Sequence, residues 1–167
     1  MQGRLMGSLL ALLLASAPAL AQDAKLVEKS GDWSVYSHGA SGDKICFVVS
    51  QPKSQKPEGV KRGPVYFYVS SWTKDKVKNE ISLKMGYPLK ANTPAEIAIG
   101  SDKFELFTKD EGAYLESKDK EQALIEAMKK GTTMVVQGRS ERGTLTTDEY
   151  SLLGVTAALD RGAKECP

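Results

Sequence analysis

The chain has 167 residues, and its 23 lysines and arginines nearly balance its 21 aspartates and glutamates, which gives a formal net charge of only +2. Such a balance gives no general electrostatic reason to bind nucleic acid or an anionic membrane surface. Beyond the first 21 residues, no apolar run approaches the roughly 20 residues that a membrane-spanning helix needs. The length suits a single domain with a core of its own.

Residues 1–21 have the three-part layout of a secretory signal peptide. Arg4 supplies an early positive charge, an apolar run follows, and Pro18 precedes the small residues that end at Ala21. We expect cleavage after Ala21, which leaves one β-rich domain over residues 22–167. No cysteine follows the cleavage site to carry a lipid anchor. The sequence therefore predicts an exported protein of the periplasm or the outer cell envelope.

Apolar and polar residues alternate with a period of two along most of the remaining chain, which is typical of strands in antiparallel sheets. In one of these segments Tyr66 and Tyr68 would face one side and Phe67 the other. Clusters of Gly, Pro, Asn and Asp separate the segments and indicate turns. The pattern predicts a mainly β single domain, either an antiparallel β-sandwich or a barrel-like sheet, with one or two short helices near the C-terminus. The expected strands lie at 33–36, 45–49, 65–72, 81–85, 97–99, 104–107, 113–115, 134–137 and 145–153.

The longest polar stretch, residues 52–64, reads as an exposed loop. It carries four cations, Lys53, Lys56, Lys61 and Arg62. Because lysine-rich loops are also common solvated features, we take these residues as a possible partner-binding loop rather than as a defined site.

Helical spacing of apolar residues predicts a helix after Asp119, which can cap it with Gln122 three residues on. Gly131 would supply the left-handed stop. A second, shorter helix is expected over residues 155–161, and it would bring Cys166 back toward the strand that contains Cys46.

Cys46 and Cys166 are the only cysteines. An even pair in an exported protein favours a disulfide. The alternative is a metal or redox role, but two isolated cysteines cannot build a four-ligand zinc site and there is no Cys-x-x-Cys motif. We therefore predict a structural disulfide.

No group of residues predicts a catalytic, metal or cofactor site. The single histidine, His38, lies in a turn-like context without a Gly-x-Ser-x-Gly elbow, and there is no phosphate-binding loop. The adjacent carboxylates at 110–111 and 148–149 would point to opposite faces of a strand, so solvated charges are the favoured interpretation. Export and near-neutral charge also argue against nucleic acid as a ligand of the aromatic strand at 66–68.

Several short segments are weak signals singly but form a more specific set when they occur in this order. They are GDWSV at 31–35, ICFV at 45–48, FELF at 104–107, LIEAMKKG at 124–131, VVQGRS at 135–140, RGT at 142–144 and YSLLGVTAAL at 150–159, followed by Cys166. This set resembles the invasion-associated locus B (IalB) family of exported bacterial proteins. Many relatives have a cysteine shortly after the tryptophan, where this chain has Ser37. The pairing of Cys46 with Cys166 therefore follows from the lack of another partner and not from the family pattern.

The resemblance implies export and, in pathogens, a link with entry into host cells, but no agreed biochemical activity. The favoured hypothesis is a non-enzymatic envelope protein that binds another envelope protein or a glycan, without a cofactor. The alternatives are a periplasmic hydrolase-like enzyme and a structural or chaperone-like envelope protein.

Overall fold

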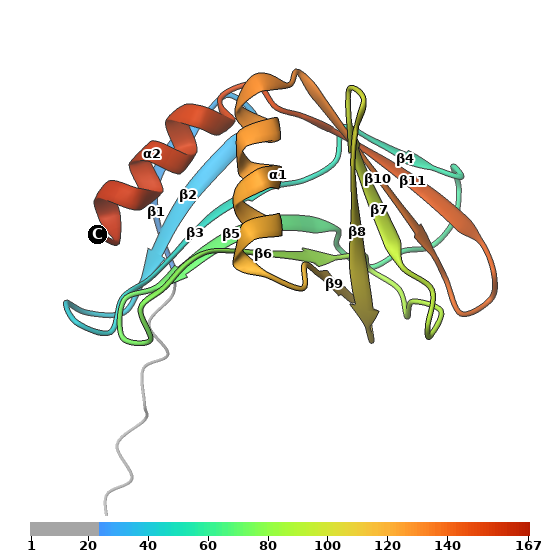
Figure 1. Cartoon of the computed structure of the whole chain (residues 1–167), viewed down its shortest axis with the longest axis horizontal. Helices are drawn as coiled ribbons and strands as arrows, with labels where there is room; N and C mark the ends of the chain where they lie inside the picture. The colour runs from blue at the N-terminus through green and yellow to red at the C-terminus, as the bar shows by residue number, and fades with distance from the viewer. Residues whose placement is uncertain (1–23) are drawn as a thin grey trace, which may run out of the picture.

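The computed structural model describes residues 24–167, so the predicted signal peptide and its cleavage point lie outside the described residues. The described part is mainly β and contains two helices (Figure 1). The strands are β1 (Lys25–Ser30), β2 (Trp33–His38), β3 (Ile45–Ser50), β4 (Ser54–Lys56), β5 (Tyr66–Trp72), β6 (Val77–Lys84), β7 (Ala95–Ile99), β8 (Asp102–Lys109), β9 (Gly112–Tyr114), β10 (Thr133–Arg139) and β11 (Leu145–Ser151). The helices are α1 (Lys118–Lys130) and α2 (Val155–Glu165).

All strands join one antiparallel sheet in the order β1-β2-β3-β5-β6-β9-β8-β7-β10-β11-β4. Strand β8 connects its two halves (Figure 1), because its first part pairs with β7 and its last residues, Phe107 to Lys109, pair with β9. The sheet bends there, so that its halves face each other across a single core. The predicted class, a mainly β antiparallel single domain with short helices, is confirmed.

Three aromatic side chains hold the two halves together. The rings of Trp33 and Phe67 meet edge to face with centroids 5.7 Å apart, and those of Phe67 and Tyr150 do the same at 6.0 Å. All three side chains are fully buried, and such pairs add to the stabilisation from burial itself. The Trp33 indole also donates a hydrogen bond to the Ser151 carbonyl at 3.0 Å, which joins β2 to the end of β11.

Both helices pack on the inner face of the sheet. Helix α1 contacts β6 and β8, and α2 contacts β1, β2 and β3. Helix α2 approaches the sheet closely because Gly162 lies against Val48, where an added Cβ would be 3.0 Å from a Val48 methyl group. The second helix is longer than predicted, since it continues from Val155 to Glu165.

The ends of α1 differ from the sequence-based expectation. Ser117, and not Asp119, caps the helix, and its hydroxyl accepts a hydrogen bond from the Lys120 amide at 3.4 Å. Gly131 has a φ of −84°, so it is extended and not left-handed. Its small size is required for another reason, because an added Cβ would come within 2.5 Å of an Ile99 methyl group.

Two strands were not expected from the sequence. Strand β4 lies inside the predicted loop of residues 52–64 and pairs with β11. All its residues are exposed and polar, so no alternation of apolar side chains reveals it. Strand β1 is also mostly exposed and pairs with β2.

Glu121 of α1 is a buried acid, with 8% of its surface exposed. Its carboxylate accepts a hydrogen bond from the Ile81 amide at 3.0 Å, but burial outweighs this contact and raises the pKa of Glu121. A raised pKa in the folded state means that stability falls as the pH rises through the range in which the unfolded chain ionises.

Glu121→Gln keeps the acceptor oxygen but cannot ionise. We therefore expect its free energy of unfolding, relative to that of the wild type, to increase by up to about 1 kcal/mol as the pH rises from 4 to 7. Urea unfolding at the two pH values measures the difference. Glu58→Gln, at an exposed position, is the matched control and should show no such trend. An equal difference at both pH values would contradict the proposed ionisation cost.

Candidate functional site

The four cations of the predicted loop lie in different environments. Lys53, Lys56 and Lys61 are exposed, as expected, and the Lys53 ammonium pairs with a carboxylate oxygen of Asp32 at 2.7 Å. Arg62 departs from the expectation of an exposed loop, because only 6% of its side-chain surface is exposed.

The reason for this burial is a two-pronged ion pair with Asp148. Arg62 Nη1 lies 2.6 Å from Asp148 Oδ1, Nη2 lies 2.7 Å from Oδ2, and Nη2 also donates to the Met85 carbonyl at 2.9 Å. Asp148, on β11, is completely buried, so its interpretation as a solvated charge is wrong. Burial alone would lower the pKa of Arg62, but the hydrogen bonds and charge of Asp148 raise it overall, and the guanidinium stays charged.

Two aromatic side chains enclose this pair. The guanidinium carbon of Arg62 lies 4.9 Å from the centre of the Tyr87 ring, a cation–π geometry. The Tyr87 hydroxyl shares a 2.5 Å hydrogen bond with Thr146. Burial, helped by the Asp148 charge, raises the pKa of Tyr150. Among the described residues, the buried Tyr150 hydroxyl and Arg62 Nε have no hydrogen-bond partner.

An open pocket of about 360 Å³ lies next to the ion pair. It forms where the segment before β5 and the segment after β6 meet the turn between β10 and β11. Its walls combine cations, carboxylates, hydroxyls and the Tyr87 ring, so they can contact both the polar and the apolar parts of a ligand. Its lining includes Lys61, Arg62, Tyr87, Glu141, Arg142 and Thr144.

The structure therefore brings Lys61 and Arg62 to one pocket and leaves Lys53 and Lys56 outside it. Sequence reasoning missed Tyr87 and Arg142, and it wrongly interpreted Asp148 as a solvated charge. The burial of Asp148 could have been predicted, because alternation along β11 places it on the same face as Tyr150 and Leu152, which predicts an inward side chain.

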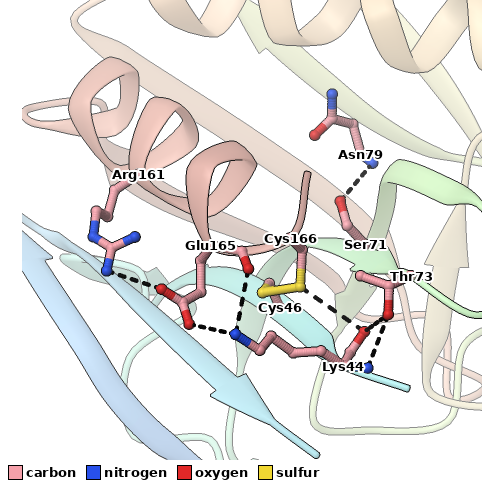
Figure 2. The surroundings of a disulfide bond; sticks show 8 residues. All are labelled: Lys44, Cys46, Ser71, Thr73, Asn79, Arg161, Glu165 and Cys166. Atoms are coloured by element: carbon pink, nitrogen blue, oxygen red, sulfur yellow. Dashed lines mark hydrogen bonds and ion pairs between the residues drawn. A yellow bond between two sulfur atoms is a disulfide. The ribbon is translucent and has the colours of Figure 1, made fainter. Parts of the chain in front are cut away.

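The predicted disulfide between Cys46 and Cys166 is present, with the two Cα atoms 6.0 Å apart. It links β3 to the residue that follows α2, and both cysteines are buried. Figure 2 shows the neighbouring ion pairs: Glu165 contacts the Lys44 ammonium at 2.8 Å and the Arg161 guanidinium at 2.9 Å. Lys44 first, and then Arg161, hold the pKa of Glu165 below its usual value. Ion pairs and the disulfide thus fix the end of α2 together.

His38 ends β2 and is half-buried. Residues 24–167 contain no group of three His, Cys, Asp or Glu side chains placed to hold a metal ion. No helix described by the structure is both long and apolar enough to cross a membrane.

A family model described as invasion associated locus B (IalB) protein matches residues 33–163. Among solved structures, the crystal structure of invasion associated protein B from Bartonella henselae is similar, with a TM-score of 0.62 and 18% sequence identity. The match covers 84% of this chain and 97% of the Bartonella chain, and at this identity it supports the fold alone. No curated protein matches the chain. Since the family model spans most of the sequence, the chain belongs to the invasion associated locus B (IalB) family.

Proposed function

We propose that this protein is an exported, non-enzymatic binding module of the cell envelope, and that the pocket beside the Arg62–Asp148 pair receives its partner. The observation that carries the proposal is the pocket itself, whose floor is fixed by a buried, two-pronged ion pair and whose rim carries the exposed cations Lys61 and Arg142. A rigid floor reduces the ordering cost of binding, and exposed charges at the rim guide the approach of a partner.

Two further observations support export. Residues 1–21 have the layout of a signal peptide, and a buried disulfide fits an oxidising compartment such as the periplasm. The Bartonella henselae protein is named as invasion associated. By analogy, we propose that this chain also contributes to host-cell entry. Such a role would require it to bind its partner at the envelope surface.

The pocket proposal is tested by affinity capture from a solubilised envelope fraction, with mature protein that retains its disulfide. We expect the wild type to retain a partner that Lys61→Glu/Arg142→Glu loses, because the double change reverses both rim charges. Lys74→Glu/Lys164→Glu is the matched control, since it makes the same change in charge at exposed positions outside the pocket. Equal capture by the two variants, or no capture by the wild type, would contradict the proposal.

A further inference from the structure

Aromatic side chains gather on the outer face of the sheet, which is the face opposite the helices. The register places them in rows that run across the strands. These side chains are half-buried or exposed, unlike their inward-facing neighbours Phe67 and Val69, which belong to the core. The cluster, here called the aromatic face, comprises Tyr36, Phe47, Tyr66, Tyr68, Trp72, Phe107 and Tyr114.

The rings of the aromatic face contact one another. Tyr36 stacks on Phe47 with ring centres 5.4 Å apart, Phe47 meets Tyr68 edge-on at 6.0 Å, and Tyr66 lies 5.6 Å from Tyr68. Mutual packing holds the rings in place before any ligand arrives. Little side-chain entropy is then lost on binding.

One row is long enough to hold an extended chain. It runs from Lys29 on β1 through Ser34, Val49, Tyr68, Ser82 and Tyr114 to Phe107 on β8. With the usual spacing between strands, this row measures roughly 29 Å. It contains the hydroxyl groups of Ser34 and Ser82 and the rings of Tyr68, Tyr114 and Phe107, and it ends at a lysine.

A hollow of about 390 Å³ lies at one end of the aromatic face. Tyr36, Tyr66 and Val49 line it together with Ser34, Gln51 and the charged residues Lys29, Asp32 and Lys53. Rings and hydrogen-bonding groups thus meet in one cavity. A sugar ring has the matching chemistry, because its C–H face can stack on a tyrosine while its hydroxyls bond to Ser, Gln and the phenol groups.

The charges that border the aromatic face are mostly positive. Lys84 lies opposite Tyr66 and, through Gly112, in one row with Lys109, while Lys29 lies opposite Ser34. All three lysines are exposed. This surface also carries carboxylates: Glu80, at the end of the row that contains Phe47 and Ser70, Glu105, two residues before Phe107 on β8, and Asp32, which lines the hollow and pairs with Lys53 at 2.7 Å. This arrangement complements a ligand that carries carboxylate or phosphate groups.

From these observations we infer that the aromatic face binds an acidic polysaccharide strand, with sugar rings on the tyrosines and acidic groups on the lysines. The inference goes beyond the pocket proposal, because the two surfaces have no lining residue in common. A bilayer surface is the less suitable occupant, since the rings are packed against the sheet and the hollow has polar walls.

The test uses mature, disulfide-bonded protein and three probes: polygalacturonate oligomers, dextran oligomers of similar length, and phosphatidylglycerol vesicles. Titration calorimetry gives the affinity. The fluorescence of Trp72, on the aromatic face, gives a second readout that the fully buried Trp33 should not share. We expect polygalacturonate to bind more tightly than dextran, and added salt to weaken its binding.

Tyr36→Ala/Tyr66→Ala should weaken polygalacturonate binding by about tenfold or more, by analogy with the loss of stacked rings in grooves that bind single-stranded nucleic acid. Lys29→Ala/Lys84→Ala changes only exposed side chains and keeps the test valid should the tyrosine variant fail to fold; it should weaken polygalacturonate binding and leave dextran binding unchanged. Lys61→Glu/Arg142→Glu, which tests the pocket, should bind polygalacturonate like the wild type.

Failure of polygalacturonate to bind, or unchanged binding by the lysine variant, would overturn the inference. Binding to the vesicles alone would replace it by lipid attachment. A failed partner capture at the pocket would leave this result unaffected, so the two proposals can fail separately.

Discussion

Asp148→Ala is expected to lower the free energy of unfolding by about 3–5 kcal/mol, because it leaves the Arg62 guanidinium buried without its counter-charge. Both side chains are almost completely removed from solvent, and Arg62 makes two short contacts to Asp148 but only one to the backbone, at the Met85 carbonyl. The remaining bond to Met85 cannot compensate for a buried positive charge. Urea unfolding monitored by circular dichroism measures the loss.

The matched control is Asp43→Ala. Asp43 also pairs with a cation, Lys74, but the distance is 3.8 Å and both side chains are about 70% exposed, so its removal should cost about 0–1 kcal/mol. If the two variants lose the same stability, the burial argument is wrong. The double variant Arg62→Met/Asp148→Leu removes both charges at once and should recover much of the loss. It should also disturb the pocket, since Arg62 is part of its lining.

Cys46→Ala/Cys166→Ala is expected to cost about 4–5 kcal/mol, the value that the chain-entropy model gives for a closed loop of roughly 100 residues. The two cysteines are 120 positions apart, so the disulfide restricts most of the unfolded chain. Loss of the link should loosen α2 first, because Cys166 is its C-terminal cap residue.

The measurement is urea unfolding of the wild type and the variant, each with and without reductant. Reduced wild type should be as unstable as the variant, and the variant should not respond to reductant. A variant as stable as the oxidised wild type would show that the ion pairs of Lys44 and Arg161 with Glu165 hold the end of α2 unaided.

Alternation of side chains explains how much of this fold could be predicted. Phe67 is fully buried while Tyr66 and Tyr68 remain on the outer face, as a period of two requires. The disulfide could also be predicted, because the choice of partner was forced. Two kinds of feature could not be predicted: those held by backbone hydrogen bonds alone, and those that depend on contacts between residues far apart in the sequence. Strand β4 is held by its backbone pairing with β11 and shows no side-chain pattern.

The candidate site was predictable only in part for a similar reason. Lys61 and Arg62 were recognised as cations, but nothing in a polar segment shows which of two neighbours turns inward. That choice depends on Asp148, which is 86 positions away. The cap of α1 at Ser117 in place of Asp119 is a local difference of another kind, because Ser and Asp are equally good caps.

The two end strands of the sheet have a consequence for the behaviour of the protein at high concentration. An exposed end strand can pair with a second chain and start aggregation. Here β1 carries the exposed charges Lys25, Glu28 and Lys29 and is interrupted by a bulge. At the other end, β4 has only three residues, all polar and exposed, and is followed by Pro57, which lacks an N–H group. Neither edge strand presents a long, regular row of unpaired N–H and C=O groups. Self-association by pairing of edge strands is therefore disfavoured.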